Sequence, residues 1–130
     1  MHSNSSMRTP LGRVRGLGSA KSGTGHFWLQ RVTAVANVIL TVVFLGVVIS
    51  LVGKPYQAAV AVLSHPLVAI LMLLFTVSGV VHMRLGMQVI IEDYVHGEGL
   101  KIAAVMANTF FAIAIGAACV FALLKRSFGG

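Results

Sequence analysis

A histidine inside a long apolar segment is the first residue of this chain whose type and position could do chemistry. His82 lies within Leu67–Ile91, nine residues before its end, which is about 13 Å along a helix at ~1.5 Å per residue. Ionisable groups at membrane depth are costly, so each one needs a reason. Two hypotheses stay open for His82: a neutral imidazole that is hydrogen-bonded to a neighbouring helix, or a ligand of a bound group.

Small residues surround His82 on the helical wheel. At about 100° per residue, Ser78 and Gly86 lie within roughly 40° of it and Gly79 lies about 60° away. This arrangement leaves room beside the backbone for a bulky flat ligand such as a haem. Small residues also mediate close helix packing, so the pattern fits both hypotheses.

A haem iron held by two histidines needs a second histidine at the same depth. None of the other four is predicted there, because they lie in the amino-terminal tail or in the connections between segments: His2, His26, His65 and His96. A haem at His82 would therefore take its second axial ligand from a methionine of this chain or from another subunit. Three helices are also too thin to enclose a macrocycle, so a haem implies a partner membrane protein.

Further polar residues follow on the segment of His82. Asp93 returns to within about 20° of the face of His82 if the helix continues that far, and Tyr94 follows it at the helix mouth. An acid beside a phenol can donate, accept and relay protons, although tyrosine is also an ordinary interfacial anchor. Arg84 lies about 200° from His82, which favours snorkelling to the cytoplasmic interface over contact with an anionic cofactor group.

Uncharged polar residues recur in the other two apolar segments. Thr33, Asn37 and Thr41 lie four residues apart in the first, and Asn108 lies in the third. Hydrogen bonding between helices explains this pattern better than chemistry does.

Three apolar segments must position these residues. Val32–Val52 and Ile102–Leu124 contain no charged residue, and these two and Leu67–Ile91 are each long enough as helices to cross the ~30 Å hydrocarbon core of a bilayer. We expect an all-α membrane protein with three transmembrane helices, at about 32–52, 67–91 and 102–124. The expected organisation is a basic amino-terminal arm at 1–30, a membrane domain at 31–124 and a short tail at 125–130.

The composition agrees with lipid as the solvent. Of the 130 residues 57% are hydrophobic and 10% are charged, and ten Lys or Arg against three acids give a formal charge of +7. A soluble domain has about 25% charged residues. The single cysteine, Cys119, excludes a disulfide framework and a four-cysteine iron–sulfur or zinc site built by this chain alone. The dispersed basic residues lack interleaved aromatics, which argues against nucleic-acid binding.

Basic residues that flank the first helix predict its orientation. Five Lys or Arg precede that helix when Arg31 is included, whereas the first connection contains only Lys54. The amino terminus is therefore expected in the cytoplasm, and the carboxyl terminus outside. Lys125 and Arg126 would then lie outside, against the rule, but the flank of the first helix usually dominates.

The run from His82 to Val95, HMRLGMQVIIEDYV, resembles the signature of the hydrophobic membrane-anchor subunits D of succinate dehydrogenase. That signature is a histidine, a glycine four residues later, and Asp-Tyr eleven and twelve residues later. The segment Gly25–Ala34, GHFWLQRVTA, is similar to the one before the first helix of this family, especially in alphaproteobacterial members. The resemblance covers roughly residues 23–124.

The resemblance implies a four-subunit respiratory complex, succinate:ubiquinone oxidoreductase, in a bacterial inner membrane. A flavoprotein oxidises succinate, an iron–sulfur subunit carries the electrons, and two membrane subunits bind haem b and ubiquinone. This chain would be one of those two membrane subunits, with no catalytic activity on its own.

The same resemblance implies roles for individual residues. His82 would be an axial ligand of the haem b iron, with the second histidine supplied by the cytochrome b556 subunit. Tyr94 and Asp93 would line the ubiquinone site, with Tyr94 donating a hydrogen bond to a quinone carbonyl. Arg31 matches a family arginine near the haem propionates and the quinone. Three more residues are candidates for cofactor binding: His26, Arg84 and Gly86.

Two other functions remain open at this point. One is the membrane anchor of a quinol:fumarate reductase, which runs the same chemistry in reverse. The other is a non-redox membrane protein, either a small transporter subunit or an assembly factor, in which His82 is a proton relay or a packing residue.

Overall fold

Every regular element of the described chain is a helix. The computed structural model describes residues 9–16 and 23–128. Its elements are α1 (Pro10–Val14), α2 (Gly23–Leu51), α3 (Tyr56–Leu63), α4 (Pro66–Tyr94) and α5 (Glu98–Ser127). Of these, α2, α4 and α5 are long and apolar enough to cross a membrane. The prediction of an all-α protein with three membrane-spanning helices is confirmed.

The three long helices extend beyond the predicted spans. The predicted boundary between residues 30 and 31 lies inside α2, which begins at Gly23. The predicted tail likewise begins inside α5, which ends at Ser127. Hydropathy identifies only the apolar part of a helix, which lies in the hydrocarbon core. Backbone hydrogen bonding continues beyond that part until a residue ends the helix. Residues 1–8 and 17–22 of the predicted arm, and 129–130 of the predicted tail, lie outside the described residues.

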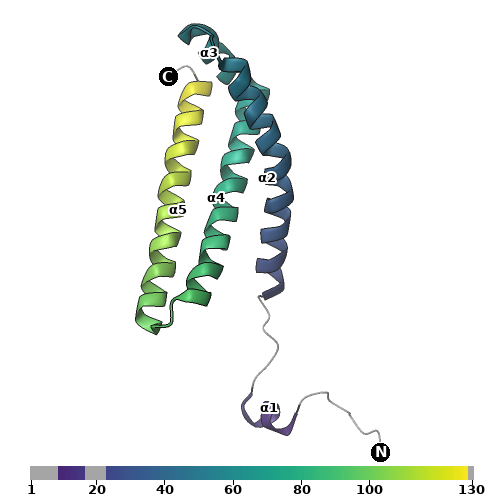
Figure 1. Ribbon diagram of the computed structural model, residues 1–130, viewed down its shortest axis with the longest axis vertical. Helices are drawn as coiled ribbons and strands as arrows, with labels where there is room; N and C mark the ends of the chain where they lie inside the picture. Colours follow the sequence, from purple (N-terminus) through teal and green to yellow (C-terminus); the bar gives the residue numbers. More distant parts are fainter. Residues whose placement is uncertain (1–8, 17–22, 129–130) are drawn as a thin grey trace, which may run out of the picture.

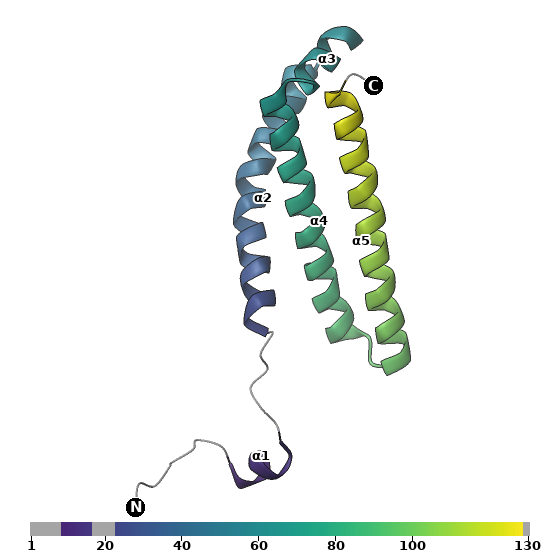
Figure 2. The same ribbon diagram turned by 180° about the vertical axis from the view of Figure 1, so that it is seen from behind.

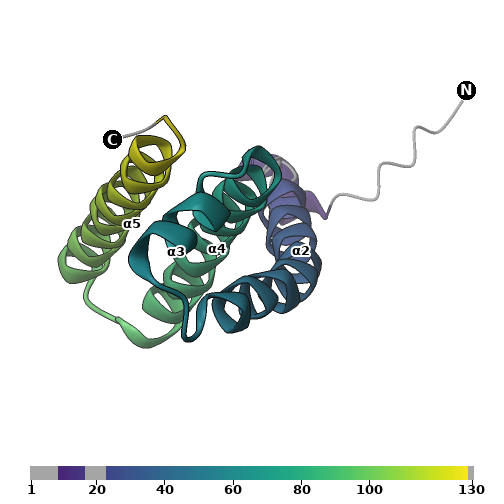
Figure 3. The ribbon, with the colours of Figure 1, turned by 90° about the horizontal axis from the view of Figure 1, so that it is seen from above.

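Helix α4 lies between the other two long helices. Figures 1 and 2, which view the molecule from opposite sides, both show α2 and α5 flanking α4. The short helix α3 contacts α4 and α5 at the end of the bundle where α4 begins, as the view from above shows (Figure 3). The row order of the long helices is therefore their order in the chain.

Local sequence signals explain where the helices end and begin. Gly53 has a φ of 74° just after α2, a left-handed conformation that glycine adopts without a steric penalty. Pro66 occupies the first turn of α4, where its missing N–H costs no helical hydrogen bond. These two signals set the connection through α3.

Helix α4 packs closely against both α2 and α5, although few side chains of the described chain are buried. A Cβ added at Gly116 of α5 would lie 3.4 Å from Val80 Cγ1 of α4. On the other side, the rings of Phe44 and Phe75 stack with their centroids 4.9 Å apart. The large apolar side chains of α2 and α5 are mostly exposed, so these outer faces meet lipid or another membrane protein.

Replacing Ala112 by leucine is expected to destabilise the seam between α4 and α5. Ala112 is 1% exposed, and inserting a larger side chain at a packed position typically costs about 1–3 kcal/mol. The measurement is the thermal unfolding midpoint of the protein in mild detergent. The control is the same substitution at Ala114, which is exposed on the same helix. Equal shifts in the two variants would contradict a packing role for Ala112.

Candidate functional site

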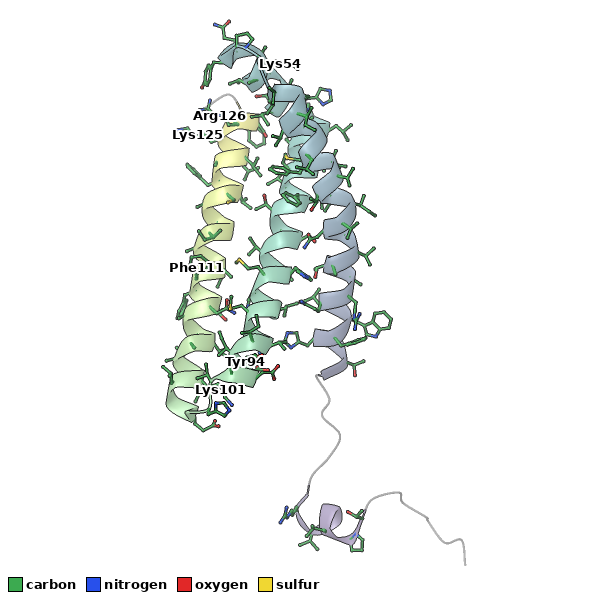
Figure 4. The ribbon with its side chains drawn as sticks, in the orientation of Figure 1. Lys54, Tyr94, Lys101, Phe111, Lys125 and Arg126 are labelled. Carbon is green, nitrogen blue, oxygen red and sulfur yellow. The ribbon has the colours of Figure 1, made fainter. Side chains whose placement is uncertain are left out.

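Two adjoining cavities between α2 and α4 form one groove, which we call the His82 groove. Their volumes are about 430 Å³ and 530 Å³, and His82 and Ala34 line both. This volume is in the range of small-molecule and cofactor sites. Figure 4 shows side chains of α2 and α4 that project into the region between the two ribbons. The polar lining residues are His26, Gln30, Arg31, Asn37, Thr41 and His82.

The imidazole of His82 is held by a threonine of the neighbouring helix. Its Nδ1 lies 3.1 Å from Thr33 Oγ1. The Thr33 hydroxyl has one hydrogen, which it donates to the carbonyl oxygen of Leu29 at 2.8 Å. The hydroxyl oxygen therefore accepts from His82, so the proton of the neutral ring is on Nδ1. This tautomer leaves Nε2 with a free lone pair, and His82 makes no other hydrogen bond within the described residues.

Three buried polar atoms on α2 have no hydrogen-bond partner within the described residues. They are His26 Nε2, Gln30 Oε1 and Asn37 Oδ1, and all three side chains line the His82 groove. Buried polar atoms are nearly always paired, so each exception calls for an explanation. The groove is therefore suited to a ligand or partner that carries polar groups of its own.

His26 lies in the groove of His82 rather than in a tail apart from it. The sequence-based expectation was wrong on this point because α2 begins early enough to include His26. Along α2, His26 precedes Thr33 by seven residues, about 10 Å at ~1.5 Å per residue. Thr33 is level with His82, so His26 is too far along the axis to bind the same iron as His82. The expectation that a haem at His82 would take its second axial ligand from elsewhere is therefore unchanged.

Arg31 and Gly86 also contact the groove or its walls. The Arg31 guanidinium lies 4.9 Å from the centre of the Phe27 ring, and both residues line the cavity nearer the start of α2. A Cβ at Gly86 would lie 3.5 Å from Gln30 Nε2. The glycine thus allows the Gln30 amide to lie against α4.

Arg84 lies outside the His82 groove, in the seam between α4 and α5. Its Nε donates to Thr109 Oγ1 at 3.4 Å, and its carbonyl oxygen accepts from Asn108 Nδ2 at 2.9 Å. The prediction that Asn108 bonds between helices is confirmed. Among the described residues, Arg84 makes no hydrogen bond to another candidate residue, and it does not line the His82 groove.

Asp93 and Tyr94 lie at the end of α4, apart from the groove. The helix does continue through Asp93, as the shared face with His82 required. Tyr94 is 77% exposed, and its side chain extends from the bundle end in Figure 4. Neither side chain has a hydrogen bond or ion pair within the described part of the chain. Along the helix, Tyr94 is about 18 Å from His82.

Comparison with known proteins assigns the chain to a family. Residues 5–123 match the family model described as succinate dehydrogenase/fumarate reductase transmembrane subunit. The chain belongs to this family. No solved structure matches the chain significantly.

Curated relatives in the family cover nearly the whole chain. The succinate dehydrogenase hydrophobic membrane anchor subunit of Paracoccus denitrificans is 37% identical over 121 residues, 93% of each chain. The subunit of the same name from Rickettsia bellii (strain RML369-C) is 30% identical over 119 residues, 92% of this chain and 95% of its own. The succinate dehydrogenase membrane anchor subunit of Reclinomonas americana is 34% identical over 98 residues, 73% of this chain and 82% of its own. The resemblance drawn from the sequence is confirmed.

Sequence reasoning did not predict that two polar residues line the groove: it did not single out Gln30, and it named Asn37 only for hydrogen bonding between helices. Gln30 and Asn37 each bring a buried polar atom into the groove. Their signal was present, since Asn37 belongs to the predicted stripe of Thr33, Asn37 and Thr41, and Gln30 lies three residues before Thr33 on the same face of α2. The stripe was interpreted as hydrogen bonding between helices, which is true of Thr33 alone among its members.

Proposed function

We propose that this membrane anchor subunit of succinate dehydrogenase contributes His82 as an axial ligand of haem b. The observation that carries the proposal is the 3.1 Å contact between His82 Nδ1 and Thr33 Oγ1, in which His82 is the donor if the Thr33 hydroxyl hydrogen goes to the Leu29 carbonyl. Metal-ligating histidines almost always donate their other ring N–H to a protein oxygen, which fixes the tautomer and the ring orientation. In this chain that oxygen is Thr33 Oγ1, and the nitrogen left for iron is Nε2.

The groove residues fit a haem in their chemistry as well as in space. A haem has an apolar macrocycle and two carboxylates, and the groove combines apolar walls with Arg31 and the unpartnered His26 Nε2. In this proposal Arg31 and His26 bind the carboxylates, while small residues beside His82 leave room for the ring. The bound haem supplies one-electron redox chemistry. The cytochrome b556 subunit supplies the second histidine and covers the open side of the groove.

Asp93 and Tyr94 contribute to a ubiquinone-reduction site at the end of α4 in this proposal. Their exposure and lack of partners within the described residues suit a site completed by other subunits. The Tyr94 hydroxyl donates to a quinone carbonyl, and the Asp93 carboxylate is placed beside it to exchange protons with water. The iron–sulfur subunit would dock at this end and deliver electrons that the flavoprotein takes from succinate.

The proposed location is a bacterial inner membrane with the amino terminus in the cytoplasm. The concentration of basic residues before α2 supports this orientation. It directs Tyr94, the end of α4 and the start of α2 to the cytoplasmic side, since α2 and α4 are antiparallel neighbours (Figure 1).

Purification from native membranes tests the proposal. The chain, tagged at its carboxyl terminus, is isolated in mild detergent and its visible spectrum is recorded after reduction. We expect a b-type haem signal, a flavin signal and three copurifying proteins in equal amounts. A preparation that contains neither haem nor flavoprotein, although the chain is intact and folded, would overturn the proposal and favour the non-redox alternative. A tagged membrane protein of unrelated function, purified in parallel, controls for adventitious haem.

Replacing Thr33 by valine is expected to weaken haem retention by about 10- to 100-fold, the range measured for partners of metal ligands. Valine keeps the shape of threonine but cannot accept the proton of His82 Nδ1. The measurements are haem content during detergent washing and the haem midpoint potential. The control is Thr41→Val, on the same stripe but without a bond to His82. Unchanged retention and potential in Thr33→Val would contradict a positioning role for Thr33.

A further inference from the structure

A charged side chain lies inside the membrane-spanning part of α4, and the proposed function does not use it. Arg84 precedes the end of α4 at Tyr94 by ten residues, which is about 15 Å along a helix at ~1.5 Å per residue. A guanidinium keeps its positive charge in proteins. Charges at this depth are costly, and they usually pair with another group. The position of Arg84 therefore calls for a partner.

The guanidinium of Arg84 does not reach the membrane surface. Its Nε donates to Thr109 Oγ1 at 3.4 Å, and Thr109 lies eleven residues after the start of α5 at Glu98. That is about 16 Å from the end of the bundle where α4 finishes and α5 begins (Figure 1). Helical side chains also tilt toward the start of their helix, which for Arg84 is the direction away from Tyr94. The charge is thus held at the depth of Thr109 rather than among the headgroups.

The terminal nitrogens of Arg84 have no partner in the described part of the chain. The bond to Thr109 is the one that its guanidinium makes there, and neither terminal nitrogen is enclosed by the described residues. The exposed side chains beside Thr109 on α5 include Met106 and Ile113, which lie about 60° and 40° from it on the helical wheel. Accessible charged donors therefore lie next to apolar side chains at membrane depth.

Neither this chain nor a second copy of it in the same orientation has an acid at this depth. The three acids, Glu92, Asp93 and Glu98, all lie where α4 finishes and α5 begins. Glu92 is eight residues from Arg84, about 12 Å along the helix, and it accepts a hydrogen bond from Gln88 at 2.7 Å. Lipid phosphates lie outside the hydrocarbon core. The remaining source of a negative charge is a different membrane protein.

We propose that Arg84 forms an ion pair with an aspartate or glutamate on a membrane-spanning helix of another subunit, which packs across α4 and α5. Charge complementarity selects this partner. A guanidinium binds a carboxylate through two parallel hydrogen bonds, and the two terminal nitrogens of Arg84 are available as donors. Because Arg84 lies about 200° from His82 around α4, this contact is separate from the His82 groove. It relies on the assembly of the chain with other subunits and not on a haem.

Retention of the partner subunit by three Arg84 variants tests the proposal. The complex is purified through the tagged chain in mild detergent, and the ratio of the partner membrane subunit to the chain is followed during washing. Arg84→Lys keeps the charge and should retain the partner. Arg84→Gln should lose it about tenfold faster or more, and Arg84→Glu, which brings two carboxylates together, faster still. Natural retention in Arg84→Gln or Arg84→Glu would overturn the ion pair without contradicting membership of the complex.

Thr109→Val is the matched control for a role of Arg84 within the subunit. It removes the hydroxyl that accepts from Arg84 Nε and leaves the charge in place, so the partner should stay bound. An equal loss of the partner from Thr109→Val and Arg84→Gln would mean that Arg84 acts by holding α4 against α5. That result would also overturn the proposal.

Crosslinking of the Arg84→Lys complex identifies the carboxylate. A membrane-permeant carbodiimide joins a lysine amine to an adjacent carboxylate as an amide and leaves as the urea. We expect mass spectrometry to map a crosslink from position 84 to an aspartate or glutamate in a membrane-spanning segment of the partner subunit. Lys101 and Glu98, 3.8 Å apart in this chain, are the internal control for the reagent. If these two are joined but position 84 is linked to no acid of another subunit, the proposal is wrong.

Discussion

Replacing His82 by alanine is expected to remove the b-type haem signal from the assembled complex, to less than about a tenth of its normal content. The substitution deletes the groove histidine that lies level with Thr33 and contacts its hydroxyl, which is the proposed ligand of the haem iron. Without this axial ligand the remaining groove contacts do not bind iron directly. The measurements are the reduced-minus-oxidised visible spectrum and the haem content per flavin.

A second histidine substitution is the control for this prediction. His65→Ala changes a histidine at the start of α4, at the other end of the bundle, and should leave the haem spectrum unchanged. Subunit composition is followed in both variants by gel analysis of the purified complex. An unchanged spectrum in His82→Ala would remove the ligand assignment. If His82→Ala loses the haem and the other subunits together, a second variant, His82→Met, separates ligand loss from failed assembly. Methionine restores an axial ligand, so the haem spectrum should shift rather than disappear.

Replacing Tyr94 by phenylalanine is expected to lower ubiquinone reduction by about tenfold or more while succinate oxidation with an artificial acceptor continues. The change removes one hydroxyl from an exposed side chain, so we expect the stability of α4 to be unchanged. Losing one hydrogen bond to a partly charged group costs about 1.5 kcal/mol or more, which is roughly a tenfold change in rate. The measurement is the ratio of the two activities in the same preparation.

Tyr56→Phe is the matched control for Tyr94→Phe. Tyr56 is also exposed but lies at the opposite end of the bundle, near Arg126, and both activities should stay normal in this variant. Parallel loss of quinone reduction and artificial-acceptor activity in Tyr94→Phe would indicate defective assembly and contradict a role at the quinone. Normal quinone reduction would exclude the hydroxyl from the site.

Hydropathy predicts the membrane helices because lipid demands long apolar segments whose backbone bonds are satisfied internally. It does not predict where α2 begins, since residues before Arg31 are polar enough to resemble a tail. That one boundary decides whether His26 and Gln30 belong to the groove. Their helical spacing with Thr33 was visible, but only the packing of α2 on α4 shows which neighbour the stripe meets.

Helical spacing relates residues within one helix. It therefore predicts which residues of a helix share a face, but not which residues of two helices contact each other. It grouped His82 with Gly86 and Asp93 correctly, because all three are on α4. It could not pair His82 with Thr33, which is 49 residues away in the sequence. It also could not show that Arg84 bonds to α5 rather than reaching the interface. Contacts between helices depend on rotation and tilt, which the sequence of one helix does not encode.

The row order of the long helices has a consequence for how the subunit is made. Because α4 packs on α2, and α5 packs on α4, each helix that leaves the ribosome finds its neighbour already inserted. Contacts between sequential helices close short loops and form quickly. The three helices can therefore pack together during translation, before a cofactor or another subunit binds. The groove between α2 and α4 would then form in the bilayer before another subunit packs against it.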